Sequence, residues 1–274
     1  FGSNTEMALA LNMCLPIFVY LAREEQDRRV RIALRIAFAL TVVAIPFTYS
    51  RGGVVGLVVV LALLFLKARS RLALIPVVAV ALVAFVWFAP ERWTTRMETL
   101  QTYQQDSSAQ LRLMSWRVGW ELARDYPIQG GGFKVFTYRA TYDRYMPEYP
   151  RSFGHDAHSI YFNLLGEHGW VGLGLFTLLV LFVLDTLRQL RKLSRAHHGL
   201  AWISNYAHML EVSIVAYLVT GTFLSVAYFD LAYQLFALAA ILKAVAEREL
   251  VGDPARAPVA PRALPGRPLP ARLR

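Results

Sequence analysis

Residues 153–176 read FGHDAHSIYFNLLGEHGWVGLGLF and change from polar to strongly apolar along their length. The segment holds three histidines, two carboxylates and a glycine-rich entry into a long hydrophobic helix. Just before it lies a polar stretch of about 65 residues, far longer than an ordinary connection between helices, which favours a folded functional loop. We expect any chemistry to lie where this loop meets the membrane.

The apolar content of the chain is typical of membrane proteins. Hydrophobic residues make up 56% of the 274 residues and aromatic residues 13%, and the apolar residues come in long blocks. Each block is near the roughly 20 residues that an α-helix needs to cross the hydrocarbon core. The sequence therefore predicts an all-α, polytopic integral membrane protein with about seven transmembrane helices. The blocks are residues 5–21, 32–49, 54–66, 72–89, 170–187, 207–228 and 231–246.

Both the start of the chain and its cysteine content limit the interpretation. The chain begins at Phe1 with no methionine and no signal peptide, and it runs directly into an apolar helix. We therefore expect an N-terminally truncated fragment that lacks upstream helices. The single cysteine, Cys14, lies inside the first apolar block, so the sequence offers neither a disulfide framework nor a thiolate metal site.

Basic residues set the expected orientation in the membrane. Lys and Arg cluster after the first, third, fifth and seventh apolar blocks, which places these connections in the cytoplasm by the positive-inside rule. The turn at residues 50–53, the long loop and the turn at 228–230 then face the other side. This topology accounts for the net charge of +10, so we do not expect nucleic acid as a partner.

We expect one membrane domain made of three parts, followed by a tail. Residues 1–89 hold the first four transmembrane helices, residues 90–157 form one large periplasmic loop, and residues 158–246 hold the last three helices. Together these parts form a single domain. Residues 247–274 are rich in Pro, Ala and Arg and are expected to be a disordered, basic cytoplasmic tail.

The large loop contains one predicted helix. Ser107 and Ser108 are the expected N-caps of a helix that continues to Tyr126, before Pro127 and a glycine triplet. Apolar side chains recur along it at helical spacing, which is typical of an amphipathic helix on the outer leaflet. Residues 139–151 show no clear period and are expected to be irregular. The predicted apolar stripe consists of Leu113, Trp116, Trp120 and Ala123.

Arg51 lies in a short turn between two apolar helices, on the side opposite to the basic loops. Burying an arginine unpaired in a membrane costs about 2.5–3.5 kcal/mol, so it needs an anionic partner. In one interpretation the partner is a lipid headgroup or a loop carboxylate such as Asp106 or Asp156. In the other it is the phosphate of a ligand, whose oxygens the guanidinium binds in pairs. Arg112 and Arg117 extend the phosphate interpretation, although an arginine on an amphipathic helix is more often simply solvated.

His158 opens an apolar helix, where a histidine can be a simple helix-start residue. Its functional use would be as a general base, because the ordinary imidazole pKa of about 6.5 lets it accept a proton near neutrality. The group of His155, Asp156, His158, Glu167 and His168 also suggests a metal, but its spacings match none of the zinc motifs. The sequence contains no phosphate-binding loop, dinucleotide fingerprint or serine nucleophile elbow.

Three short motifs occur in a fixed order around the large loop. They are YSRGG at residues 49–53, QLR at 110–112 with Trp116, Pro127 and GGGF at 130–133, and AHSIYF at 157–162 with GEHG at 166–169. Each motif alone is weak, but the ordered set resembles the O-antigen ligase and O-antigen polymerase superfamily. The resemblance is strongest to the O-glycosylation ligases that accompany the exosortase A system, whose preceding helix is similar to residues 4–15 with Asn12 and Pro16.

The resemblance implies a multi-pass protein of the bacterial inner membrane. Its activity would move a glycan from undecaprenyl diphosphate to an acceptor hydroxyl on a protein, lipid or glycan, without a metal or nucleotide cofactor. Arg51 and Arg112 match the arginines assigned to the donor diphosphate, with Arg117 as an extension, and His158 matches the histidine assigned to the acceptor. Many relatives have His-Asn where this chain has His158-Ser159, which we interpret as variation within the subgroup.

Other functions would use a similar sequence. A polymerase of the same superfamily would differ mainly in what presents the attacking hydroxyl. A transporter of lipid-linked sugars would also use arginines for the diphosphate, but the internal repeats typical of transporters are absent from the sequence. If the protein is a non-catalytic scaffold, Arg51, Arg112 and His158 can all be changed without consequence. Glu211 and Asp230, near the ends of spanning helices, raise a pathway or ion-pair hypothesis.

Overall fold

The computed structural model describes residues 3–67, 107–147 and 156–251. Over these residues the chain forms eight α-helices and two short 3₁₀ helices, and no strand. The predicted all-α fold is therefore confirmed. The predicted span at 72–89 and residues 252–274 of the predicted tail lie outside the described residues, whereas residues 247–251, also assigned to the tail, form the end of the last helix. The helices are α1 (Asn4–Glu24), α2 (Arg28–Phe47), α3 (Arg51–Leu66), α6 (Ser107–Asp125), η3 (Val135–Thr137), α7 (Arg139–Tyr145), α8 (Ile160–Ala196), η4 (His198–Leu200), α9 (Ala201–Gly221) and α10 (Asp230–Val251).

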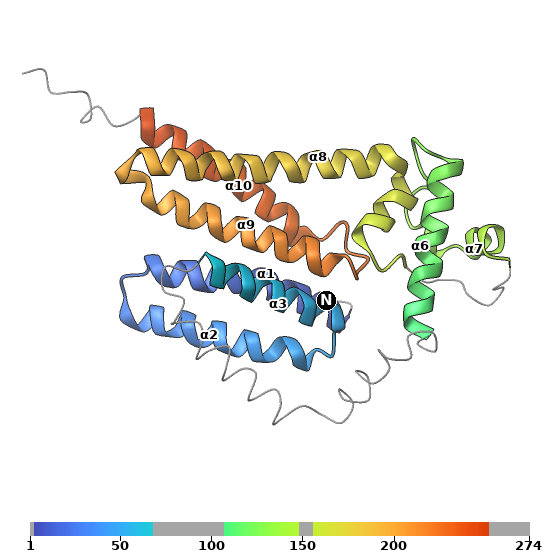
Figure 1. The fold of residues 1–274 in the computed structure, drawn as a ribbon, viewed down its shortest axis with the longest axis horizontal. Helices are drawn as coiled ribbons and strands as arrows, with labels where there is room; N and C mark the ends of the chain where they lie inside the picture. Colours follow the sequence, from blue (N-terminus) through green and yellow to red (C-terminus); the bar gives the residue numbers. More distant parts are fainter. Residues whose placement is uncertain (1–2, 68–106, 148–155, 252–274) are drawn as a thin grey trace, which may run out of the picture.

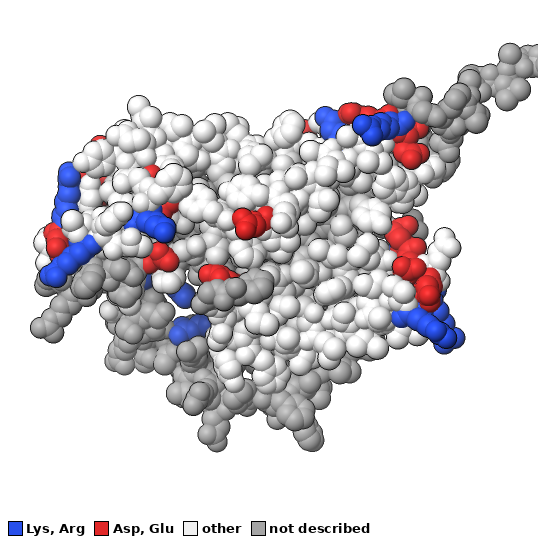
Figure 2. Space-filling model, turned by 180° about the vertical axis from the view of Figure 1, so that it is seen from behind, with Lys and Arg blue, Asp and Glu red and all other residues white. Residues whose placement is uncertain are grey.

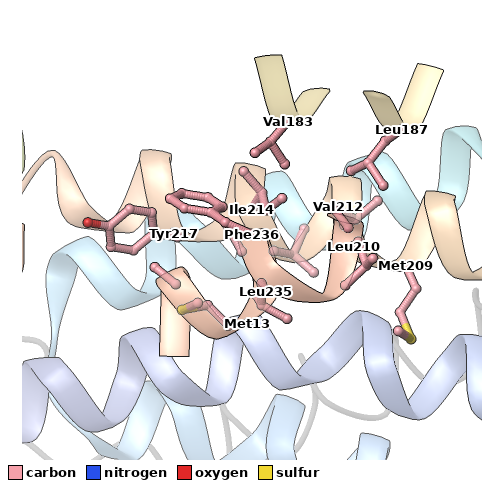
Figure 3. Packing of buried hydrophobic residues seen from close by; sticks show 14 of the residues in the cluster. Met13, Val183, Leu187, Met209, Leu210, Val212, Ile214, Tyr217, Leu235 and Phe236 are labelled. Carbon is pink, nitrogen blue, oxygen red and sulfur yellow. The ribbon is translucent and has the colours of Figure 1, made fainter. Parts of the chain in front are cut away.

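Helix α9 is at the centre of the bundle. It packs against α1, α3, α8 and α10 (Figure 1). The core around it is apolar and tightly filled, as Figure 3 shows for Val183 and Leu187 of α8, which point toward Ile214 and Val212 of α9. Because burial of each large apolar side chain contributes about 1.5–3 kcal/mol, this core holds α1, α3, α8 and α10 in register around α9.

Polar residues in the sequence set where the first three helices begin. The side chains of Ser3, Asp27 and Ser50 each accept a backbone N–H from the first turn of the helix that follows. The Ser50 hydroxyl, for example, accepts from the Gly53 N–H at 3.0 Å. An N-cap of this kind contributes about 1 kcal/mol. Of these caps, Asp27 and Ser50 lie in the short connections from α1 to α2 and from α2 to α3.

Three of the described helices, α1, α2 and α8, are long and apolar enough to cross a membrane. Helix α3 is a shorter apolar helix, as the sequence predicts. Helices α9 and α10 complete the same bundle with 21 and 22 residues. Lys, Arg, Asp and Glu gather mainly at the two ends of the visible face, which leaves most of the helical flank uncharged (Figure 2). This is the charge pattern expected of a membrane protein.

An ion-pair cluster closes one end of the bundle. Glu211 of α9 forms ion pairs with Lys67 at the end of α3 and Arg191 of α8, and His208 Nδ1 lies 3.6 Å from the same carboxylate. Lys67 and Arg191 belong to two of the basic connections that the positive-inside rule assigns to the cytoplasm. The ion-pair hypothesis for Glu211 is therefore confirmed.

Part of the large loop folds into a second, smaller core beside α8. Its buried residues come from α6, η3, α7 and the segment before α8, and α6 lies across the end of the bundle (Figure 1). The buried core residues are Val118, Leu122, Val135, Phe136, Tyr142, Met146 and Ala157. The described part of the loop, residues 107–147, is thus folded, as the loop's length predicts.

The structure corrects one sequence prediction about this loop and refines another. Of the predicted apolar stripe, Ala123 is buried, as are Val118 and Leu122 of the loop's own core, whereas Leu113 and Trp120 are 44% and 46% exposed. Contact of the exposed part of the stripe with the outer leaflet stays a prediction. Residues 139–145, expected to be irregular, form the short helix α7.

Candidate functional site

Two of the predicted site segments contact the same turn. This turn, residues 222–229, joins α9 to α10. A Cβ atom on Gly52, next to Arg51, would lie 3.0 Å from Phe223 Cβ. On the other side, the His158 backbone N–H donates to Ser225 Oγ at 2.6 Å. The turn therefore brings the start of α3 and the start of α8 to one place, although they are more than 100 residues apart in sequence.

The peptide that leads into His158 is held from two sides. The Trp116 indole Nε1 donates to the Ala157 carbonyl at 2.8 Å, and Ser225 accepts from the His158 N–H of the same peptide. The indole also stacks on Phe162, with ring centroids 5.0 Å apart and planes 8° apart. Both polar groups of a half-buried peptide are thus satisfied, which fixes its orientation.

His158 has an unusual backbone conformation. Its φ of 47° lies in the left-handed region, which non-glycine residues rarely adopt and which costs about 1–3 kcal/mol. Among the described residues, Tyr49 (φ 56°) and Lys134 (φ 60°) share this property. Each of the three lies in or directly after one of the sequence motifs. Such strain is concentrated at functional sites, where the surrounding structure holds it in place.

Arg51 is the first residue of α3 and is half-buried. The helix places the positive end of its dipole beside this guanidinium, so the region favours an anion. The start of α3 is held by Asn12 of α1, whose Nδ2 donates to the Gly53 carbonyl at 2.9 Å. Asn12 is fully buried, which explains why a polar residue occurs inside an apolar helix.

Arg112 and Arg117 both lie on α6. Arg112 is half-buried and precedes Trp116 by one helical turn, so it shares the face of α6 that reaches the Ala157–His158 peptide. Arg117 is exposed. Arg112 thus lies on the α6 face of Trp116, which contacts the peptide before His158, and Arg117 lies at the surface. The role of each arginine stays a prediction.

The glycine triplet in the loop pairs with the GEHG motif of α8. The Gly131 N–H donates to the Gly166 carbonyl at 2.8 Å, and the Gly132 N–H donates to the Glu167 carbonyl at 3.0 Å. Gly169 interrupts α8 with a φ of 65° and a ψ of −164°. A Cβ atom on Gly169 would lie 2.5 Å from the Pro127 carbonyl oxygen, so only glycine fits there. This explains why the two motifs occur together.

A second polar group in this region joins Glu167 and His168, which the sequence suggests only as metal candidates, to Tyr228, which the sequence does not assign to a site. Glu167 is only 4% exposed, and its carboxylate accepts from the Lys134 N–H at 2.8 Å and from the Tyr228 hydroxyl at 2.6 Å. The Tyr228 oxygen also lies 2.5 Å from His168 Nε2. Burial and then the neighbouring Glu167 carboxylate raise the pKa of Tyr228, which keeps its hydroxyl protonated as a donor. Tyr228 lies 61 residues from Glu167, so no local sequence pattern connects the two.

The metal question can be addressed only for part of the predicted group. Within the described residues, no group of three or more His, Cys, Asp and Glu side chains could hold a metal ion. His155 lies outside the described residues. The absence of a metal from the reaction therefore stays a prediction.

The chain was compared with known proteins. A search of curated proteins gives no match. A sequence profile of the O-antigen ligase family matches residues 36–177, just over half of the 274 residues. The matched region contains all three motifs, with Arg51, Arg112, Arg117 and His158. The chain therefore belongs to the O-antigen ligase family, whose members are membrane enzymes that transfer glycans as ligases or polymerases.

Proposed function

We propose that the protein moves an oligo- or polysaccharide from undecaprenyl diphosphate to an acceptor hydroxyl on the periplasmic side of the bacterial inner membrane. Family membership supports the reaction class. The observation that carries the proposal for this chain is the shared turn: Gly52, beside Arg51, packs on Phe223, and His158 binds Ser225 two residues later. One turn therefore contacts the neighbour of Arg51 on one side and the His158 backbone on the other, which supports a single site that includes both residues.

The proposed donor explains the arginines. A lipid-linked diphosphate is anchored in the bilayer with its sugar outside, so its phosphates lie at the membrane interface. Arg51 at the start of α3 and Arg112 on α6 would bind the phosphate oxygens and neutralise the charge that develops as the glycosidic bond breaks. Arg117, which is exposed, would act at the edge of the site. The carrier stores the required free energy, so no ATP is needed, and the arginines would neutralise the leaving diphosphate in place of a metal.

His158 would act as the general base. The acceptor oxygen attacks the anomeric carbon, the bond from that carbon to the diphosphate oxygen breaks, and the acceptor proton passes to the imidazole. The attack from the opposite face inverts the anomeric configuration. The clamp on the Ala157–His158 peptide supports this role because a base must be held within hydrogen-bond reach of the hydroxyl.

The acceptor separates the alternatives that remain. A ligase of an exosortase-associated O-glycosylation system would transfer to a protein, whereas a polymerase would transfer to a growing glycan. Deleting the gene in its host and identifying by mass spectrometry which molecule loses its sugar would distinguish them. Loss of a capped acceptor with free polymer intact supports the ligase, and a shift in polymer length supports the polymerase. Unchanged glycan on every acceptor would contradict the proposal.

The donor site has its own test. Arg51→Ala should weaken binding of the undecaprenyl-diphosphate donor as well as turnover, and Arg51→Lys should restore only part of both because an ammonium cannot bind two oxygens in a fork. Arg124 is a suitable control, since it is exposed on α6 and pairs with Glu121. Donor binding that is equal in Arg51→Ala, Arg124→Ala and the unmodified protein would rule out the proposed phosphate contact.

A further inference from the structure

The Glu167 carboxylate is buried at a point where three segments meet. Both of its oxygens are bound, one by the backbone of Lys134 after the glycine triplet and the other by Tyr228 of the α9–α10 turn. A buried carboxylate is stable only when donors satisfy it, and hydrogen bonds to a charged group are stronger than those between neutral groups. Glu167 therefore fastens the loop and the turn to the start of α8.

Tyr228 fastens the turn at a single atom. Its hydroxyl donates to Glu167 and accepts from His168 when His168 Nε2 carries a proton. The other side of the turn is tied to the bundle, because the Tyr217 hydroxyl donates to the carbonyls of Val226 and Ala227 at 3.0 and 3.2 Å. Two tyrosine hydroxyls therefore hold the turn: Tyr228 binds it to α8, and Tyr217 binds it to the core of the bundle.

Ser225 lies three residues before Tyr228 in the same turn. It accepts the His158 N–H at 2.6 Å, so the position of the turn decides the position of this acceptor. His158 depends on that acceptor because its left-handed backbone conformation is unfavourable without support. A chain of contacts thus leads from Glu167 through Tyr228 and Ser225 to His158.

We propose that Glu167 and Tyr228 are positioning residues for His158, which act by holding Ser225 against its backbone N–H. The proposal rests on the function proposed above, in which His158 accepts the proton of the acceptor hydroxyl. Neither Glu167 nor Tyr228 needs to touch substrate in this role. Their loss should affect turnover more than donor binding, because the arginines assigned to the donor lie on α3 and α6.

The test compares Tyr228→Phe with Tyr138→Phe in the full-length, reconstituted protein. Tyr228→Phe keeps the ring but removes the hydroxyl that Glu167 binds, so kcat should fall about ten- to a hundredfold with little change in KM for the lipid-linked donor. Tyr138, 60% exposed in the loop, is the control and should leave both constants unchanged. An unchanged kcat in Tyr228→Phe would overturn the proposal. So would a fall in kcat/KM that comes entirely from a higher KM.

A second comparison shows whether Tyr228 acts through His158. In a His158→Ala background, adding Tyr228→Phe should cause no further loss of residual transfer, because the residue that it positions is absent. Ser225→Ala combined with Tyr228→Phe should likewise be little worse than Ser225→Ala alone. If Tyr228→Phe lowers transfer by the same factor in both backgrounds, it acts by another route and the proposal is wrong.

The two proposals fail in different ways. Full activity of His158→Ala would contradict the general-base role itself, whatever Tyr228→Phe does. A large loss in His158→Ala, together with an independent loss in Tyr228→Phe, would leave the base in place and reject only the positioning role. Thermal unfolding in detergent detects a loss of fold separately. Glu167→Gln and Tyr228→Phe should keep the unfolding midpoint of the unmodified protein, so that a change in kcat reports on the position of His158 and not on unfolding.

Discussion

The indole Nε1 of Trp116 donates a hydrogen bond to the carbonyl oxygen of Ala157 at 2.8 Å, across 41 residues of sequence. This contact joins the loop helix α6 to the peptide that precedes His158. On the opposite side of the same peptide, Ser225 binds the His158 N–H. The loop and the helical bundle therefore meet at one peptide group, and this is where we place the reaction.

Trp116→Phe tests the loop side of this contact. Phenylalanine can still stack on Phe162, but it leaves the Ala157 carbonyl without its donor, which costs about 1–3 kcal/mol in a buried site. We expect transfer to fall about tenfold because His158 is less well held. Trp170→Phe is the matched control, since that ring is 46% exposed. A transfer assay in which both variants behave alike would refute the role of the Trp116 bond.

Gly169→Ala tests the pairing of the loop with α8. An alanine there would need a left-handed backbone and would place Cβ 2.5 Å from the Pro127 carbonyl oxygen. Together these effects should lower the free energy of unfolding by about 3 kcal/mol. Gly174→Ala, where a Cβ meets nothing within 4 Å, should be neutral or slightly stabilising. Thermal unfolding in detergent measures the stability of both variants. Equal unfolding midpoints would contradict the requirement for glycine at position 169.

Glu211→Ala tests the ion-pair cluster at the other end of the bundle. The change leaves Lys67 and Arg191 without their carboxylate, and their side chains are only 21% and 17% exposed. We expect a loss of about 1–3 kcal/mol in stability, less than for a fully buried pair because water reaches the cluster. Glu247→Ala removes an exposed partner of Lys243 and should have little effect. Denaturation of the two variants at equal midpoints would exclude a stabilising role for the cluster.

The proposed topology can be tested by cysteine labelling. After Cys14 is replaced, a cysteine at Gln129 in the loop should react with a membrane-impermeant reagent in intact spheroplasts. A cysteine at Gln26, between α1 and α2, should react only after the membrane is permeabilised, because the basic connections face the cytoplasm. Both positions have exposed side chains. The reverse pattern of labelling would contradict the orientation and the periplasmic location of the reaction.

The helical bundle was predictable because its signals are local. Long apolar blocks mark the membrane helices, and a side chain such as Ser50, which caps α3 at the Gly53 N–H, marks where a helix begins. The clustering of Glu211 with basic residues also follows from charge, since a half-buried carboxylate needs cationic partners. These features depend on composition over short distances.

The contacts that shape the candidate site were not predictable in the same way. The buried face of α6 is set by the loop core that it meets, so helical spacing alone does not show that Leu113 and Trp120 stay exposed while Val118 and Leu122 are buried. The Tyr228–Glu167 bond joins residues 61 positions apart, and Tyr228 by itself is typical of an interfacial aromatic residue. Sequence motifs point to His158, but only the fold shows that Ser225 and Trp116 hold its peptide.

The most direct measurement of the central claim is transfer by His158→Ala. Reconstituted full-length protein, supplied with undecaprenyl-diphosphate-linked glycan and acceptor in excess chelator, should transfer glycan, and His158→Ala should lower the rate about 10²–10⁴-fold while it still binds the donor. His168→Ala, which leaves the Tyr228–Glu167 bond in place, should have a mild effect. Near-normal transfer by His158→Ala would contradict the general-base role, and activity that is lost in chelator and restored by zinc or magnesium would contradict the metal-independent reaction.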